Sequence, residues 1–483
     1  MTSGRFYILL IFITGIVSLE LAAAPAAGLE IDDVKVGIAD RYKLGRWTPV
    51  RFVLNAGDQP WRGSLRISAR DGDDAWATLT GGSLSDISLA AGESRQMETY
   101  VRIGRQSSDL RIAAQPAEDA GGELIEFVSL PDGLLASQQS ILVIGGDVGL
   151  RSALRVMPRR TNEEILGTTV EKSDELPNRW FGYDGFDVLV LTTTDDTLYA
   201  ALSSQQTEAI ADWVELGGRL IVTLGASGEE FLQQPTLIGR FTPGDYVRTL
   251  PLRQVSALEA YVESSMSLGS TEAGDVRLPP LVTQLTNLQG EVVLSSGRDV
   301  PLLVRSAAGF GSVLFVAMDL DAAPLADWED RHRLLAKLLE LSLSESPASE
   351  TQQVSGEAAH LGFDDLAGQL NAALQVFDGV TMLSFSAIAA LIMLYVLLIG
   401  PLDFWLVRYV LKRPELTWVT SAALVAIFCG LAWWLAGRIR GDSPHLNQID
   451  IVDVDAATQR MRGTSWLHLY SPASRSFDIS PEP

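Results

Sequence analysis

The sequence predicts a multidomain protein with an N-terminal β-sandwich, a central α/β domain built on a parallel sheet, and two C-terminal transmembrane helices. Three observations support this prediction. Short strand-like runs alternate with turn-forming residues near the N-terminus, strands alternate with helices in the middle, and two long uncharged apolar runs lie near the other end. At 483 residues the chain exceeds the roughly 100–200 residues expected of one domain, which fits this division.

The first 27 residues are expected to be a signal peptide. Arg5 precedes an apolar run from Phe6 to Leu19, and small residues follow around Ala24 to Ala26 in the A-x-A pattern of a cleavage site. An uncleaved signal anchor is the alternative. In both cases the residues that follow are expected to be exported.

Residues 29–140 are expected to form an antiparallel sandwich of immunoglobulin-like type. Runs such as TPVRFVLNAGD, GSLRISARDGD and QMETYVRIG alternate apolar and polar residues and end at turn formers. The chain has a single cysteine, Cys429, which lies in an apolar run. The sandwich is therefore expected to lack a disulfide, and the chain to lack a thiolate metal site or a soluble cysteine nucleophile.

Residues 141–343 are expected to form the α/β domain, because SILVIGG, FDVLVLTTTDD and RLIVTLG are compact apolar strands separated by helical patterns. A helix is expected to start at Ser203 or Ser204 and to stop at Gly217. The run PLLVRSAAGFGSVLFV predicts two strands joined by a glycine turn, and WEDRHRLLAKLLELSL predicts a helix. An insertion near 235–290 is less regular.

Two uncharged apolar runs, Met382 to Pro401 and Trp418 to Gly437, each reach the ~20 residues needed to cross a membrane. The loop between them carries Arg408, Lys412 and Arg413, so the positive-inside rule places it in the cytoplasm. The predicted segments are a linker with an amphipathic juxtamembrane helix at 344–381, a first span at 382–407, a cytoplasmic basic loop at 408–417, a second span at 418–437 and an exported β tail at 438–483.

The tail is expected to hold two strands joined by a polar turn. Because a lone hairpin is marginally stable in water, the hairpin is expected either to pair with the exported region or to belong to a domain that this chain leaves unfinished.

Composition excludes several classes of function. A formal net charge of −23 and a pI near 4.6 argue against a nucleic-acid partner, which requires clustered Lys and Arg. The four histidines are widely spaced, so a His-rich metal site is not expected. A cofactor is not expected either.

The strand ends of the predicted parallel sheet are expected to form a crevice, because open α/β sheets bind ligands at the carboxyl ends of their strands. The candidate ligand residues there are Gly145, Gly146, Thr193, Thr194, Gly225 and Ser227.

An acidic cluster follows the last strand, with Asp319, Asp321, Asp327, Glu329 and Asp330. Carboxylates at strand ends can hold Ca²⁺ or Mg²⁺, but the ligand periodicity of an EF-hand is missing. A solvated cluster, or one stabilised by a helix N-terminus, is the expected arrangement.

The run YDGFDVLVLTTTDDTLYAALSSQQTEAIADWVELGGRLIVTLGASGEEFL resembles the class I glutamine amidotransferase-like superfamily, in particular its trehalose-utilisation-protein-like branch with a flavodoxin-like fold. The resemblance covers 141–343. It implies an elbow at Gly225 to Glu229, with Ser227 where the active members carry cysteine and Glu229 in place of the second glycine. The histidine and glutamate partners of that cysteine are missing, since the domain's only histidine, His332, lies in a charged helical stretch. The resemblance therefore implies a domain without the catalytic set.

The run LLIGPLDFWLVRYVLKRPELTWVT is similar to a segment of bacterial envelope proteins with an amidotransferase-like ectodomain. That resemblance implies a place in the bacterial inner membrane, in contact with the lipid bilayer. It also implies von Willebrand factor A-type membrane proteins and their AAA ATPases as partners.

These features favour a non-enzymatic sensor or scaffold, with Asp403 at the inner end of the first span as a coupling point. The alternative is an envelope hydrolase that uses the crevice around Ser227 or a metal held by Asp319 and Asp321. Transport is disfavoured because two spans offer no internal polar pathway.

Overall fold

The computed structural model separates into two compact units, Met1–Thr351 and Gln352–Pro483. The predicted signal peptide and the linker at 344–357 lie outside the described residues, as do 411 and 413–416 of the predicted cytoplasmic loop. The structure describes residues 28–72, 74–117, 123–157, 164–268, 279–297, 300–343, 365–377, 385–410, 412, 417–440, 443–473 and 475–479.

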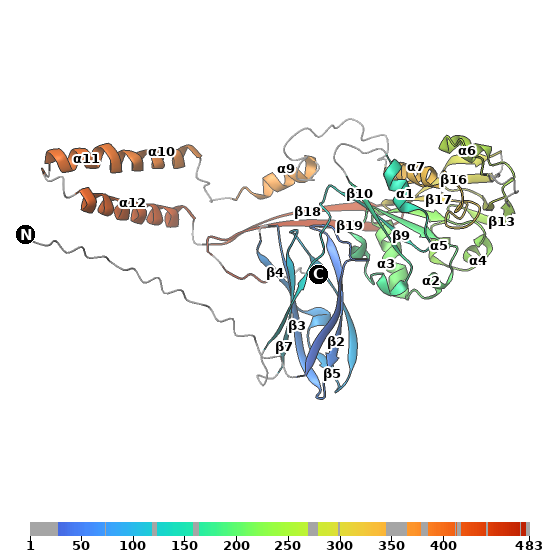
Figure 1. The fold of residues 1–483 in the computed structure, drawn as a ribbon, viewed down its shortest axis with the longest axis horizontal. Coiled ribbons are helices and arrows are strands. Elements are labelled where there is room, and N and C mark those ends of the chain that lie inside the picture. The colour runs from blue at the N-terminus through green and yellow to red at the C-terminus, as the bar shows by residue number, and fades with distance from the viewer. Residues whose placement is uncertain are drawn as a thin grey trace, which may run out of the picture. The chain divides into compact units, whose positions relative to one another are not determined.

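The N-terminal part of the first unit consists of two antiparallel sheets with a common apolar core (Figure 1). Alternate residues of the long strands face that core, so Val50, Phe52 and Leu54 of β2 are buried together with Leu65 and Ile67 of β3. One sheet has the order β1 (Leu29–Val36), β2 (Trp47–Ala56) and β6 (Ser94–Arg102). The other has the order β4 (Trp76–Leu79), β3 (Trp61–Arg70), β7 (Asp109–Pro116) and β8 (Leu124–Ser129), with β5 (Ile87–Leu89) also paired to β3 and the short helix η1 (Gly82–Leu84) before β5.

The central part of this unit is a seven-stranded mixed sheet. Its order is β10 (Ile165–Val170), β9 (Gln139–Ile144), β11 (Val188–Thr192), β12 (Arg219–Thr223), β17 (Gly311–Val316), β16 (Val300–Ala308) and β15 (Glu291–Ser296). The first five strands are parallel to their neighbours, whereas β16 and β15 pair antiparallel. The predicted parallel sheet is therefore extended by an antiparallel end, and the predicted strand pair around the glycine turn is β16 and β17.

Helices cover both faces of this sheet because its strands are apolar on both sides. In β11, Leu189 and Leu191 face one core, and Val188 and Val190 face the other. The first core includes α3 (Ser204–Glu215), whose capping box is closed by Ser203 and Gln206. The second includes α1 (Leu150–Val156), α6 (Ser256–Val262) and α7 (Arg331–Leu343).

Smaller elements complete the unit. The insertion predicted as irregular contains a two-stranded antiparallel sheet of β13 (Asp245–Pro251) and β14 (Leu281–Thr286). The remaining short helices are η2 (Ser173–Glu175), η3 (Trp180–Tyr183), α2 (Thr197–Ala200), α4 (Gly228–Leu232) and α5 (Leu237–Arg240).

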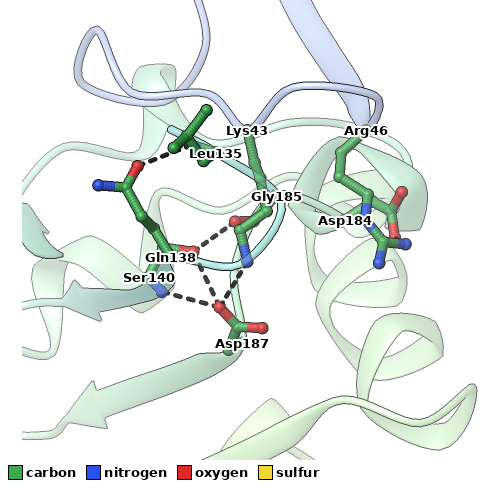
Figure 2. A network of polar contacts seen from close by, with 8 residues as sticks. All are labelled: Lys43, Arg46, Leu135, Gln138, Ser140, Asp184, Gly185 and Asp187. Atoms are coloured by element: carbon green, nitrogen blue, oxygen red, sulfur yellow. Dashed lines mark hydrogen bonds and ion pairs between the residues drawn. The ribbon is translucent and has the colours of Figure 1, made fainter. Parts of the chain in front are cut away.

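A buried polar network joins the two-sheet part to the mixed sheet (Figure 2). Lys43, whose side chain is 5% exposed, lies 2.8 Å from an Asp187 carboxylate oxygen. The same oxygen accepts a 2.8 Å hydrogen bond from the Ser140 amide, and the Ser140 hydroxyl donates to the Gly185 carbonyl. Beside this network, Ile38 is buried in the α/β core on the α3 side of the sheet. The two parts are therefore joined by a shared apolar core and by an ion pair.

Aromatic rings extend this junction along η3. The Phe181 ring centroid lies 4.7 Å from that of Tyr100 on β6 and 5.7 Å from that of Trp47 on β2. A Cβ on Gly182 would approach a Tyr100 ring carbon to 2.8 Å, so this position needs glycine. Edge-to-face contacts of this kind add to the stabilisation from apolar burial.

In the second unit a helix packs on a long hairpin. Phe377, just after α9 (Asp365–Leu374), contacts the rings of His468 and Tyr470 with centroids 5.5 and 5.6 Å apart. The Asn447 side-chain amide donates to the Leu374 and Val376 carbonyls, which satisfies acceptors at the end of α9. The hairpin consists of β18 (His445–Asp455) and β19 (Arg460–Tyr470), which confirms the two strands predicted in the tail.

Two helices in this unit, Ile388–Tyr409 and Thr417–Trp434, are long and apolar enough to cross a membrane by length and composition. Most of their large apolar side chains are exposed, as at Met393, Trp418 and Trp433, whereas a soluble core helix would bury them. The helical elements are α10 (Phe385–Leu397), the π-helical segments η5 (Leu398–Leu402) and η6 (Leu406–Val410), α11 (Asp403–Trp405) and α12 (Thr417–Arg440).

Asp403 is enclosed on the first of these helices, as is Val407. The Asp403 side chain is 1% exposed, α11 contacts α12, and the Asp403 Oδ1 atom has no hydrogen-bond partner among the described residues. The acidic group that the sequence marked as a coupling point is thus enclosed.

Removing Asp187 and removing Lys43 are expected to destabilise the protein to different extents. Asp187→Ala leaves the buried Lys43 ammonium unpaired and is expected to lower the free energy of unfolding by roughly 3 kcal/mol. Lys43→Met is expected to cost less, because Asp187 is 30% exposed and keeps its bonds from Ser140. Urea unfolding of the full chain in detergent, followed by tryptophan fluorescence, measures both.

The exposed ion pair between Arg62 and Asp86 is the matched control, and Arg62→Ala should leave the free energy of unfolding close to that of the wild type. Equal losses for all three variants would contradict a special role for the buried pair.

Candidate functional site

The candidate site lies where β12 and β17 end, at the elbow after β12. Asp319, three residues beyond the end of β17, points its carboxylate into the elbow. Its Oδ1 accepts a 2.7 Å hydrogen bond from the Gly225 amide, and its Oδ2 accepts one of 2.7 Å from the Ala226 amide. The Thr193 hydroxyl adds a longer contact of 3.4 Å to Oδ1. The Asp319 carboxylate therefore already accepts hydrogen bonds from two backbone amides of the elbow.

Glycines make this close approach possible. A Cβ on Gly225 would lie 2.6 Å from Asp319 Oδ2, and a Cβ on Gly146 would lie 2.4 Å from Asp321 Oδ2. Gly145 has a φ of +115°, and a Cβ there would lie 2.2 Å from the Thr192 hydroxyl oxygen. These three positions need glycine because neighbouring polar side chains fill the space beside them.

A second carboxylate, that of Asp321, lies where further strand ends of the sheet meet. Thr194 donates a 2.7 Å hydrogen bond to Asp321 Oδ1, and the Gly146 amide donates one of 2.7 Å to the Thr192 hydroxyl. Gly146 and Thr194 therefore gather around Asp321, as Thr193 and Gly225 gather around Asp319.

Ser227 takes no part in this network. It occupies the N-cap position of α4, and its side chain makes no capping hydrogen bond. Within the described ranges, no hydrogen bond joins its hydroxyl to a histidine or a carboxylate. His332 lies at the exposed start of α7, where its Nδ1 is 2.6 Å from the Glu329 carbonyl oxygen. Among the residues that the structure describes, Ser227 therefore has no general base of the kind that a serine nucleophile requires.

Asp319 is electrostatically unusual. Burial raises the pKa of its carboxyl, and the nearby Asp321 carboxylate raises it further, while the hydrogen bonds from Ala226, Gly225 and Thr193 oppose the rise. The net pKa shift is upward. The effect of burial, which raises the pKa, thus exceeds the effect of the hydrogen bonds, which lower it.

The acidic cluster is less solvated than the sequence suggests. Asp327 and Glu329 are exposed, but Asp319 and Asp330 are buried at 8% and 5% exposure. Asp330 accepts a hydrogen bond of 2.5 Å from the Ser264 hydroxyl. The expectation of a solvated or helix N-terminal cluster was wrong for Asp319, because tertiary donors outside the local sequence replace water there. Asp330 directly precedes α7, which is the helix N-terminal arrangement that was also expected.

A cavity of about 460 Å³ adjoins the elbow. Its wall is mainly apolar, and the Asp319 and Asp327 side chains are its charged groups. The other lining residues are Ala226, Pro251, Pro279, Pro280, Leu281, Ala322, Ala323, Pro324 and Leu325. The sequence marked neither the prolines nor the cavity, because its walls come from segments far apart in the chain. Across the described ranges, no group of three or more His, Cys, Asp or Glu side chains is arranged to hold a metal ion.

Comparisons with known proteins identify no relative. No family model and no curated protein matches the chain. The similar solved structures include an exo-β-1,4-mannosidase from Opitutaceae bacterium strain TAV5, with 13% identity and a TM-score of 0.27 over 43% of this chain and 36% of that one. A β-galactosidase from Rahnella sp. R3 has 12% identity and a TM-score of 0.23 over 42% and 31% of the two chains.

A Niemann-Pick type C2 protein from the Japanese carpenter ant has 7% identity and a TM-score of 0.18 over 23% of this chain and 96% of that one. The chain spans about a third of the length of the mannosidase and of the galactosidase. TM-scores this low assign neither a fold family nor an activity.

Asp319→Asn is expected to lower stability at neutral pH, because the side-chain amide would turn an N–H group toward one of the elbow amides. One buried donor then loses its acceptor, at a cost of about 1–3 kcal/mol. Urea unfolding at pH 7 measures the loss of stability. Ser227→Ala is the control, because it changes a neighbouring side chain without removing an ionisable group.

The same variant carries a pH prediction. Because the folded-state pKa of Asp319 is raised, the folded wild type binds a proton at a higher pH than the unfolded chain does. Its stability advantage over Asp319→Asn should therefore grow as the pH falls through the raised pKa toward the ordinary aspartate value of about 4. An advantage that shrinks on acidification would show that the amide hydrogen bonds outweigh burial.

Proposed function

We propose that this protein is a non-enzymatic scaffold or sensor of the bacterial envelope, anchored by two membrane helices. In this proposal the first unit is an immunoglobulin-like sandwich joined to a flavodoxin-like, amidotransferase-like domain that has lost its chemistry. The first unit and the C-terminal tail lie outside the inner membrane, and the basic loop between the helices lies inside.

The observation that carries the proposal is the Asp319 carboxylate in the elbow. A hydrolase of this architecture needs free backbone donors at the elbow to stabilise the negative charge of its transition state. Here the Gly225 and Ala226 amides already donate to a carboxylate of the same chain. An oxyanion at that point would find both amides already hydrogen-bonded, and the Asp319 carboxylate would repel it.

The absence of a base at Ser227 supports the same conclusion by an independent route. Serine is weakly nucleophilic unless an oriented base takes its proton, and the hydroxyl of Ser227 has no such partner among the described residues. The apolar cavity beside Asp319 could bind a small apolar group, but it brings no nucleophile to that group.

The membrane helices and the resemblance of their connecting segment support a role in an envelope complex. We propose von Willebrand factor A-type membrane proteins and their AAA ATPases as the partners, with the lipid bilayer as the surrounding medium.

A fluorophosphonate probe, which reacts with activated serines, tests the enzyme alternative directly. The full chain in native membranes should show no labelling above that of Ser227→Ala, because its hydroxyl is not activated. A known serine hydrolase in the same membranes serves as the positive control. Labelling that depends on Ser227 would overturn the non-enzymatic proposal.

Crosslinking in the same membranes tests the scaffold. The tagged protein should capture the proposed envelope proteins equally well with and without Ser227→Ala, and both versions should complement a deletion strain. Failure of Ser227→Ala to complement, with no captured partner, would favour the hydrolase.

A further inference from the structure

The open edge of the mixed sheet lies in a groove with a volume of about 1280 Å³. β10 is the edge strand, and it pairs only with β9 in the part of the chain that the structure describes. The walls come from opposite faces of the sheet. α1 belongs to one core, and the loop at 38–41 joins the other through Ile38.

The backbone of β10 offers hydrogen-bonding groups to this groove. The Val170 carbonyl accepts from the Gly145 amide after β9, so Val170, Thr168 and Leu166 direct their backbone groups toward β9. Because successive residues of a strand point their N–H and C=O groups to opposite sides, Ile165, Gly167 and Thr169 direct theirs outward. Three donors and three acceptors thus lie along the floor of the groove.

The two edges of the sheet differ in their protection. β15, at the other end, has two register irregularities against β16, and such bulges discourage pairing with another chain. β10 pairs with β9 in continuous register, and its sequence ILGTTV contains neither a charge nor a proline. Sheet edges are usually blunted by such features, and β10 lacks them.

The walls of the groove are basic in a strongly acidic protein. Arg41, Arg151 and Arg155 are exposed and form no ion pair within the described ranges. A fourth arginine, Arg331, is held by the Asp147 carboxylate at 3.7 Å. Against these four arginines, the described residues that line the groove include two carboxylates, although the chain as a whole carries a net charge of −23.

We infer that this groove binds an extended acidic segment of a partner protein, which adds a strand to β10. A polypeptide strand supplies both the donors and the acceptors that the outward backbone groups require, whereas a phosphate group supplies acceptors only. Its alternate side chains would point to the α1 wall and to the 38–41 wall, where acidic residues meet the unpaired arginines. The inference is independent of the elbow and of Ser227.

A labelled peptide tests strand addition on the full chain in detergent. The probe is an acetylated and amidated octapeptide of alternating Val and Asp, and fluorescence anisotropy measures its affinity. The isosteric Val and Asn peptide should bind at least roughly tenfold more weakly, because charge-assisted bonds to arginine are lost. Methylating the backbone nitrogens of alternate residues that face β10 should abolish binding, and methylating the intervening ones should not.

Variants of the groove give the matching result on the protein side. Thr169→Pro removes an outward N–H without disturbing the ladder to β9, and it should abolish peptide binding while leaving the thermal unfolding midpoint near that of the wild type. Arg151→Gln with Arg155→Gln should weaken binding roughly tenfold. Arg253→Gln, an exposed arginine outside the groove, should have no effect.

Several outcomes would overturn the inference. These are equal binding of the Asn peptide, equal binding of both N-methylated peptides, and no binding at millimolar peptide. Hydrogen exchange of 164–170 in the free protein is a further test. The Leu166, Thr168 and Val170 amides are protected by β9, so the informative amides are those of Ile165, Gly167 and Thr169. Slow exchange of these three without peptide would show that another segment of this chain occupies the edge, or a second copy if the protection depends on protein concentration.

Discussion

The buried ion pair between Lys43 and Asp187 is the constraint on which the arrangement of the first unit depends. It fixes the loop after β1 against the start of β9 and β11, two central strands of the mixed sheet. Because this loop also places Ile38 in the α/β core, the sandwich and the sheet share one stable arrangement. A wall of the β10 groove comes from the same loop, so the groove exists only while the junction is intact.

The elbow gathers polar groups because of its place in the sheet. Parallel strand ends bring backbone donors together, and this convergence follows from topology whichever side chains are present. Asp319 accepts hydrogen bonds from the Gly225 and Ala226 amides, so these buried donors are satisfied within the chain.

Local patterns in the sequence predicted much of the fold, because they depend on near neighbours. The helix from Ser204 follows from its capping residues, and the convergence of Thr193, Thr194 and Gly225 follows from the strand order. The insertion of Ile38, the burial of Asp319 and the open edge of β10 could not be predicted, because each depends on segments that are distant in the chain. The two long apolar helices near the C-terminus could be predicted, because apolar length is a property of one continuous segment of sequence.

The enclosure of Asp403 has a consequence for the biogenesis of the protein. A carboxylate on a lone helix that enters lipid costs up to about 3 kcal/mol near the bilayer centre. In the folded chain this side chain is 1% exposed, and its segment contacts α12. In the proposed membrane arrangement, the contact with α12 therefore shields this carboxylate from lipid. The second helix is then a condition for stable integration of the first, and the two would enter the bilayer as a pair.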